Sequence, residues 1–371
     1  MEEKFLALFL ALFFVISVLF SFLINWLFLK FSVNLGSRNK ELSQVRWSAN
    51  VKPAIGGISF FIVFLVSISV IGTIPREAST FLDKRLIGLM AASSLGFLLG
   101  LADDAYNTNP LVKFIGQLSC AYILIVSDVY IKIFGVDSVD FLITTVWVIG
   151  MMNSINMLDN MDAITTTVSA SIIAGMIAVI LSMGYIENNL YLVMLVGVLG
   201  SLIGFLYFNW NPSKIYMGDT GSQFLGVFLA ASSMVFIWDY KDAGTSEFIQ
   251  LKQFVVPMLF FIVPLIDTIT VTIRRLMRKQ SPFVGGKDHI THHLVYLGLN
   301  DRQVASILIF VSLTSIPFSV LIITGTIEWN WAVTFGAFAY FTLVFIIFQL
   351  LYNKGKRIFE ERQTNVVKSV I

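Results

Sequence analysis

Long apolar segments recur along the whole of this 371-residue chain, and they constrain its fold more than any other feature. A helix needs roughly 20 apolar residues to cross a bilayer, and we place about eleven segments near that length. They lie at about 5–29, 55–74, 85–101, 112–127, 139–155, 164–183, 190–208, 222–238, 254–273, 304–325 and 330–352. With 57% hydrophobic and 13% charged residues, the chain could not stay soluble as an ordinary globular domain. The sequence therefore predicts an all-α, multi-pass membrane protein.

The distribution of Lys and Arg predicts the orientation of the helices, because basic residues accumulate on the cytoplasmic side of membrane proteins. If the N-terminus lies outside, most of the 25 Lys and Arg residues fall in cytoplasmic segments, and an odd number of spans leaves the C-terminus inside. We expect one transmembrane domain over residues 1–353 and a short charged cytoplasmic tail over 354–371. The net charge of +2 argues against a nucleic-acid partner.

Acidic residues at the ends of apolar segments are candidates for chemistry, since ionisable groups near the hydrocarbon boundary are costly and usually serve a function. Asp103 and Asp104 follow the third segment. Adjacent like charges raise each other's pKa, which a divalent cation would compensate. The alternative is a solvated helix end in which Asn107-Thr-Asn-Pro110 forms Asx turns. Asp267, inside the ninth segment, is expected to order the helices or to pair with a basic group.

A polar stripe follows the fifth segment. The residues with the spacing of one helical face are Asn153, Asn156, Asp159 and Asn160, with Asp162 three residues beyond Asp159. Such a stripe cannot face lipid, so it faces the interior of the helix bundle or a wet cleft. The alternative to a substrate site is a purely structural hydrogen-bond network between helices.

The segment Gly-Asp-Thr-Gly-Ser from Gly218 directly precedes another apolar segment. We expect Thr220 or Ser222 to cap that helix, which places Asp219 beside a helix N-terminus. Such a terminus can also bind phosphate through its free backbone amides. Simple capping is the alternative.

The loop after the ninth segment carries the chain's three histidines, His289, His292 and His293. Their spacing would place all three imidazoles on one helical face. Phosphate binding beside Lys287 is favoured over zinc, because no cysteine lies nearby and there is no His-Glu-x-x-His pattern. Arg275 and its basic neighbours could instead reflect only the preference of basic residues for the cytoplasmic side.

Taken together, these segments resemble the polyprenyl-phosphate N-acetylhexosamine-1-phosphate transferase family, which also contains the phospho-MurNAc-pentapeptide transferase. Four separated motifs agree with it in order and sidedness: Asp103-Asp104, Asn-x-x-Asn-Met-x-Asp-x-x-Asp from Asn153, Met-Gly-Asp-Thr-Gly-Ser from Met217, and Ser-Pro-Phe followed by His-x-x-His-His. The wording Asp-Asn-Met-Asp is closer to the WecA/TagO-like branch. The chain departs from the family at Ala163, where the family has glycine. It also departs before Pro53-Ala-Ile-Gly-Gly57, where either Arg46 or Lys52 takes the role of the family's basic residue.

The resemblance implies an activity. N-acetylglucosamine-1-phosphate, or a related N-acetylhexosamine-1-phosphate, would pass from a UDP-sugar to undecaprenyl phosphate, releasing UMP and initiating a lipid-linked cell-surface glycan. The reaction would take place on the cytoplasmic face of a bacterial cytoplasmic (inner) membrane, with Mg²⁺ as cofactor and Mn²⁺ as the alternative. Other readings are the phospho-MurNAc-pentapeptide transferase of peptidoglycan synthesis and, in a different class, a membrane transporter. A homodimer is an open expectation.

The same resemblance assigns roles to residues. Asp103, Asp104 and Asp219 would be catalytic, and Asp219 and Asp104 would hold the metal ion. The substrate-binding residues would be Asn156, Asp159, Asp162, Arg275, Lys287, His289, His292 and His293. Because the second pKa of a phosphate monoester is about 6, the lipid phosphate is largely a dianion at neutral pH. We therefore favour direct in-line attack over a covalent aspartyl-phosphate intermediate.

Overall fold

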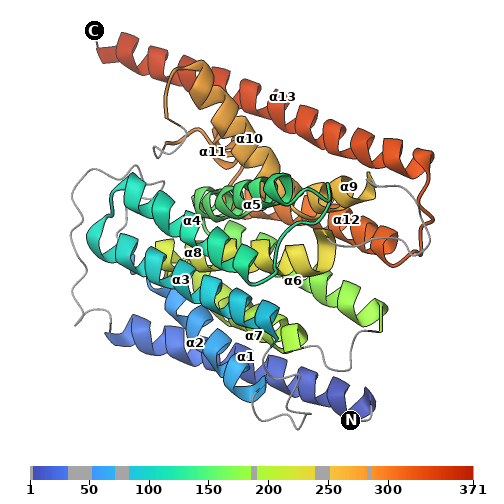
Figure 1. Cartoon of the computed structure of the whole chain (residues 1–371). Helices are drawn as coiled ribbons and strands as arrows, with labels where there is room; N and C mark the ends of the chain where they lie inside the picture. The colour runs from blue at the N-terminus through green and yellow to red at the C-terminus, as the bar shows by residue number, and fades with distance from the viewer. Residues whose placement is uncertain are drawn as a thin grey trace.

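The computed structural model describes residues 3–31, 52–71, 83–184, 190–238, 251–281 and 286–370, and most of these residues are helical (Figure 1). The helices are α1 (Glu3–Phe31), α2 (Gly56–Ile71), α3 (Lys84–Tyr106), α4 (Pro110–Val126), α5 (Asp137–Leu158), α6 (Ile164–Ser182), α7 (Leu190–Asn209), α8 (Gly218–Ser233) with a π-helical extension (Met234–Trp238), α9 (Lys252–Phe260), α10 (Ile262–Met277), α11 (Ile290–Tyr296), α12 (Asp301–Ile323) and α13 (Trp331–Val370). The described residues contain no strand beyond an isolated bridge between Ala54 and Tyr216. The all-α prediction is confirmed.

The number of membrane spans is lower than predicted when helix length is the criterion. Within the described ranges, eight helices are long and apolar enough to cross a membrane, or nine if the bent pair α9 and α10 counts as one span. Every one of the predicted segments coincides with a helix or with that pair. However, α2 and α4 have only 16 and 17 residues. At 1.5 Å per residue such helices cover about 25 Å, less than the roughly 30 Å of hydrocarbon.

The bend of 86° between α9 and α10 has a local cause in the sequence. Pro264 lies in the first turn of α10 and has no amide hydrogen to donate to the carbonyl of Phe260, four residues earlier. The helix therefore ends at Phe260 and a new helix begins in another direction at Ile262. This break directs the end of α10 towards α11.

Helix α8 forms the centre of the bundle, with α2, α3 and α5 packed around it. Of its most apolar stretch, 89% is buried, compared with 28% for α1 and 17% for α13. In Figure 1, α1 and α13 lie at the two outer sides of the bundle. Large apolar side chains such as Leu19 and Phe335 are exposed on these two helices. An apolar outer surface is expected where helices face lipid.

Two glycines let neighbouring helices approach the start of α8 closely. A Cβ atom on Gly57 would overlap the backbone of Gly221, and one on Gly100 would overlap the carbonyl oxygen of Asp219. The segment before α2 also pairs with the segment before α8, where the amide of Gly57 donates to the carbonyl of Met217 (2.9 Å). The position of Asp219 is thus fixed by backbone packing on two sides.

The ends of α3 and α8 bear on two predictions made from the sequence. The turn expected at Asn107-Thr-Asn-Pro110 is present, since Asn107 ends α3 with φ = 52° and the Asn109 side chain caps α4. The helix end is not simply solvated, however, because Asp103 is buried. The expected cap of α8 by Thr220 or Ser222 is wrong, because the helix already begins at Gly218, ahead of both residues. The Thr220 hydroxyl donates to Asp104 instead.

Candidate active site

Asp219, in the first turn of α8, lies where three helices meet. Its Oδ1 accepts a hydrogen bond from Nδ2 of Asn156 at the end of α5 (2.6 Å), and the same Nδ2 donates to Ser222 (2.9 Å). Nζ of Lys113, in the first turn of α4, lies 3.9 Å from Oδ2 of Asp219. The Asp219 side chain is still 30% exposed. The carboxylate is therefore oriented by its neighbours and remains open to a ligand.

The two adjacent acids at the end of α3 have different surroundings. Oδ2 of Asp104 accepts hydrogen bonds from the amide (2.8 Å) and hydroxyl (2.7 Å) of Thr220. Asp103 is buried, accepts from the amide and hydroxyl of Thr108, and pairs with Lys113 (2.8 Å). The pair thus connects α3 to both α4 and α8. The sequence predicted no site role for Lys113, which counted only as one of the basic residues of the chain. Its position in the first turn after Pro110, in the segment that follows Asp103 and Asp104, could have indicated a cation beside these acids.

The acids at this end of the bundle outnumber the cations beside them. Lys113 is shared by Asp103 and Asp219, while Asp104 is held by neutral donors. Just after α5, burial and then the charges of Asp219, Asp104 and Asp162 raise the pKa of Asp159 to about 8. Such an excess of negative charge fits a bound cation.

The donor set suits magnesium better than a transition metal. In the described ranges no group of three or more His, Cys, Asp or Glu side chains is arranged to hold a metal ion unaided. Magnesium commonly binds one or two carboxylates and completes its coordination with water and substrate phosphates. Asp219 and Asp104 fit that requirement.

The side chain of Asp162, three residues beyond Asp159, is hydrogen-bonded to the segment between α7 and α8. Its two oxygens accept hydrogen bonds from the amide (2.9 Å) and hydroxyl (2.7 Å) of Ser213 and from the side chain of Asn211 (3.1 Å). Lys52 donates to the same Ser213 hydroxyl (3.0 Å), whereas Arg46 lies outside the described residues. The geometry favours a role for Asp162 in shaping the site rather than in contacting substrate.

Ala163 occupies a backbone conformation that explains the glycine of the resembled family. Its φ angle is +67°, in the left-handed region that glycine adopts without steric cost. The amide of Ala163 donates to the side chain of Asn209 (3.1 Å), which also donates to the carbonyl of Ile215 (3.1 Å). The turn therefore ties the end of α5 to the segment that leads into α8.

The polar stripe on α5 divides between two roles. Asn153 exchanges hydrogen bonds with Gln117 of α4, and Gln117 also bonds to Gln223 of α8. This is the structural network that the sequence left open as an alternative. Asn156, one turn further, points instead to Asp219. Asp159 and Asn160 lie beyond the end of α5 at Leu158, so the stripe is not one continuous helical face.

Asp267 orients His289, a role that the sequence indicated only as pairing with a basic group. Oδ2 of Asp267 lies 2.8 Å from Nδ1 of His289, and Oδ1 accepts the amide of Ile290 (2.9 Å). Asp267 and His289 are 3% and 4% exposed. Since the carboxylate accepts a hydrogen bond from Nδ1–H, it fixes the orientation of the ring and leaves Nε2 of His289 for another partner.

The three histidines do not share one helical face. His289 precedes α11 as its N-cap residue, and its amide donates to Nδ1 of His292 (3.4 Å). Burial, then the neighbouring histidines, lower the pKa of His292, while burial followed by the positive charge of Arg274 lowers the pKa of His293 to about 4. His292 and His293 are therefore neutral at pH 7, and would contact a phosphate as hydrogen-bond donors rather than as cations.

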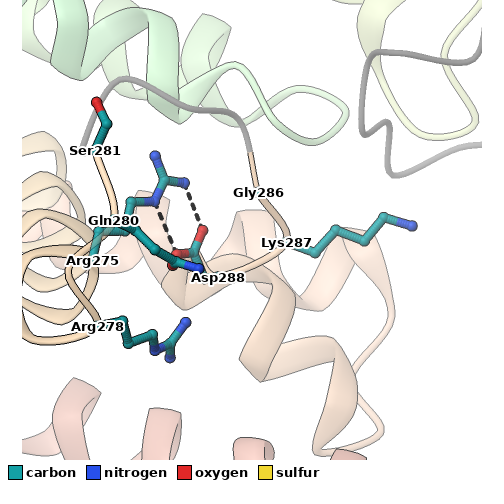
Figure 2. A pocket seen from close by; sticks show the side chains of 7 residues that line it. All are labelled: Arg275, Arg278, Gln280, Ser281, Gly286, Lys287 and Asp288. Atoms are coloured by element: carbon teal, nitrogen blue, oxygen red, sulfur yellow. Dashed lines mark hydrogen bonds and ion pairs between the residues drawn. The ribbon is translucent and has the colours of Figure 1, made fainter.

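A cavity of about 460 Å³ opens beside this segment, lined by Arg275, Arg278, Gln280, Ser281, Gly286, Lys287 and Asp288 (Figure 2). Arg275 forms two hydrogen bonds to Asp288, of 3.0 and 2.6 Å. Burial of Asp288 opposes its ionisation, but Arg275 outweighs this effect and holds the pKa of Asp288 below its usual range. Figure 2 shows Lys287 pointing away from this ion pair. The lining carries more positive than negative charge, which suits an anionic ligand.

A hydrogen bond between Thr291 of α11 and Asn160 (2.8 Å) joins the histidine segment to the acidic one. The fold thus brings predicted residues together: the acids on α3 and α8 meet near the end of α5, and the histidine segment is joined to the turn after α5. Arg275 pairs with Asp288, next to this segment.

Comparison with known proteins identifies a matching family model and several relatives of this chain. Residues 86–237 match the model of the family described as glycosyl transferase family 4. The chain is 28% identical over 262 residues to the probable undecaprenyl-phosphate N-acetylglucosaminyl 1-phosphate transferase of Bacillus subtilis, with 68% of each chain covered. It is 27% identical to the undecaprenyl-phosphate alpha-N-acetylglucosaminyl 1-phosphate transferase of Thermotoga maritima (70% of this chain and 74% of the relative). A more distant relative is the phospho-N-acetylmuramoyl-pentapeptide-transferase of Staphylococcus carnosus, 28% identical over 70% of this chain and 82% of the relative. The resemblance inferred from the motifs is confirmed.

Proposed function

We propose that this chain, whose residues 86–237 carry the glycosyl transferase family 4 region, transfers a sugar-1-phosphate from a UDP-sugar to undecaprenyl phosphate and releases UMP. N-acetylglucosamine-1-phosphate is the favoured group, in line with the names of the Bacillus and Thermotoga relatives. The observation that carries the proposal is the meeting of Asp103, Asp104 and Asp219 around Lys113 and Asn156, from motifs far apart in the sequence.

The reaction exchanges one diphosphate bond for another. A lipid phosphate oxygen attacks the phosphorus that bears the sugar, the new P–O bond forms, and the bond from that phosphorus to the UMP oxygen breaks. Two anionic phosphates must meet, and at 4 Å two unit charges repel by about 4 kcal/mol at an effective dielectric of 20. The principal task of the site is therefore electrostatic.

We assign the magnesium ion to Asp219 and Asp104, where it would neutralise phosphate charge when bound. Asn156 keeps the Asp219 carboxylate in one orientation, and Thr220 does the same for Asp104. Lys113 neutralises Asp103 and places a positive charge near Asp219. Asp159 would face the donor substrate.

The histidine segment and the basic cavity are assigned to the donor's diphosphate or sugar. His289, oriented by Asp267, presents Nε2, while Arg275 is held in place by Asp288. Because the lipid phosphate is already a dianion, Asp103 is not required as a general base, and direct attack is favoured. Trapping of a radiolabelled phosphosugar on the protein in the absence of lipid would replace direct attack by a covalent intermediate.

The location of the site follows from the proposed orientation, with the N-terminus outside and the C-terminus in the cytoplasm of a bacterial inner membrane. Trp26 and Tyr207, at the ends of α1 and α7, are exposed, and the ammonium groups of Lys30 and Lys214 lie 5.2 and 5.5 Å from their rings. Aromatic and basic side chains of this kind gather at membrane interfaces. A homodimer remains a prediction, which the mass of the detergent-solubilised protein tests.

The deciding experiment is UMP release by purified protein with undecaprenyl phosphate and a panel of UDP-N-acetylhexosamines, with and without EDTA. Release that requires lipid and magnesium is expected, with UDP-N-acetylglucosamine the best donor. A preference for UDP-MurNAc-pentapeptide would favour the peptidoglycan alternative. Asp219→Asn is expected to fold normally and to lose about 10²- to 10³-fold in kcat, as when one electrostatic stabiliser is removed. Unchanged turnover in that variant would exclude the assigned role.

A further inference from the structure

Helix α13 continues its apolar face beyond the length needed to cross a bilayer. Roughly 20 residues are enough for the crossing, so a span that begins at Trp331 is complete near residue 350, whereas the helix runs to Val370. The residues with three-and-four spacing on this face are Val344, Phe348, Tyr352, Gly355 and Phe359. Tyr352 is only 1% exposed and Gly355 is buried, while Asn353, Lys354 and Arg357 around them are exposed.

The end of this face packs directly on the histidine helix α11, as Figure 1 shows for the two helices. The rings of Tyr352 and His293 lie 3.6 Å apart, and those of Phe359 and Tyr296 stack at 4.3 Å. Between these two contacts, Gly355 touches the α11 backbone, where an added Cβ would overlap the carbonyl oxygen of His293. The absence of a side chain at Gly355 sets the distance between the two helices.

Arg274 of α10 ties the same part of α13 from a second side. Its guanidinium lies 3.8 Å from the centre of the Tyr352 ring and donates to Gln349 and Asn353, both at 2.9 Å. Gln349 in turn donates to Thr270 of α10 (2.6 Å). Helices α10, α11 and α13 are thereby joined around Tyr352.

Helix α11 needs such support, because an isolated helix of seven residues is not stable in water. One side of α11 is held by Asp267 and Asn160 through Ile290 and Thr291. We propose that the extension of α13 is the other support, a clamp in which Gly355, Tyr352 and Phe359 are positioning residues that set the place of the histidines. This inference rests on the proposed function and adds that affinity for the donor substrate is controlled from the C-terminal helix.

The test is Gly355→Ala, with Gly336→Ala as the matched control on the same helix, where an added Cβ has no neighbour within 4 Å. The added methyl must separate α11 from α13, and a displacement of about 1 Å can cost up to about 100-fold in rate. We expect the KM for the UDP-sugar to rise at least about tenfold. The KM for undecaprenyl phosphate should stay unchanged, because the acids on α3 and α8 are not displaced. Gly336→Ala should match the wild type in both.

A general loss of folded protein would lower kcat and leave both KM values alone, so the split between substrates separates positioning from stability. If Gly355→Ala does not fold, Phe359→Ala, which removes the stack on Tyr296, is measured in the same way. An unchanged donor KM in the folded variant, or an equal rise for both substrates, would overturn the clamp. Absence of UMP release by the wild type with every donor would instead refute the proposed function.

Discussion

Replacing Asp267 of α10 with Asn tests whether its contact with His289, which precedes α11, is needed for the chemistry. The carboxylate accepts one hydrogen bond from His289 and one from the amide of Ile290. An Asn side chain has one acceptor oxygen and an NH₂ donor, so one of those two donors would face another donor. Either the ring of His289 turns or its proton moves to Nε2, and both change what the histidine offers to the donor substrate.

The magnitude follows from the bond that is lost. A hydrogen bond to a charged group contributes about 1.5–3 kcal/mol, which at 1.4 kcal/mol per tenfold corresponds to a fall in kcat/KM of about 10- to 150-fold. The assay is UMP release under subsaturating UDP-sugar. Asp140→Asn is the matched control: Asp140 is 2% exposed and also accepts backbone amides. It lies in the first turn of the 22-residue helix α5, whose other end leads to Asp159, about 30 Å away.

A double variant separates an effect through His289 from an effect on folding. If Asp267 acts by orienting the histidine, Asp267→Asn added to His289→Gln should cause no further loss of kcat/KM. Full activity of a folded Asp267→Asn protein, or losses that simply add in the double variant, would refute the reasoning.

Two further predictions concern packing and pH. Gly100→Ala would push α3 away from the carbonyl of Asp219 and should reduce kcat by at least about tenfold, whereas Gly150→Ala, where an added Cβ meets nothing, should not; equal activity of the two variants would show that the close approach is unimportant. The pKa of His293 is lowered to about 4 by burial and by Arg274, from about 6.5 in the unfolded chain, so below pH 6.5 the unfolded state binds a proton that the folded state does not. Proton uptake by His293 should therefore lower the free energy of unfolding by about 2 kcal/mol between pH 7 and pH 5, in addition to the loss from His292, whose pKa is also lowered. Thermal unfolding of His293→Gln should show a decrease that is smaller by that amount; the same slope in both proteins would contradict this origin.

The sequence was sufficient for the helices and for the reaction class. Apolar length alone located the long helices, because the cost of unpaired backbone groups in lipid leaves few other structures. It did not locate the short helix α11 or the break between α9 and α10. Proline and asparagine likewise set local ends, as at Pro110 and Pro264, since their effects act within one turn. The acids and histidines were found because charged groups are rare in such a chain.

Only the tertiary structure decided which side chains contact one another. Asp162 and Asp159 look equivalent in the sequence, yet Ser213 and Asn211 satisfy the first while burial raises the pKa of the second. Lys113 and Asp267 became site residues through contacts with groups on other helices. A hydrogen bond forms only if its donor and acceptor are placed to within a few tenths of an ångström. Between helices, that placement is set by packing such as that at Gly57, Gly100 and Gly355, which no local sequence pattern encodes.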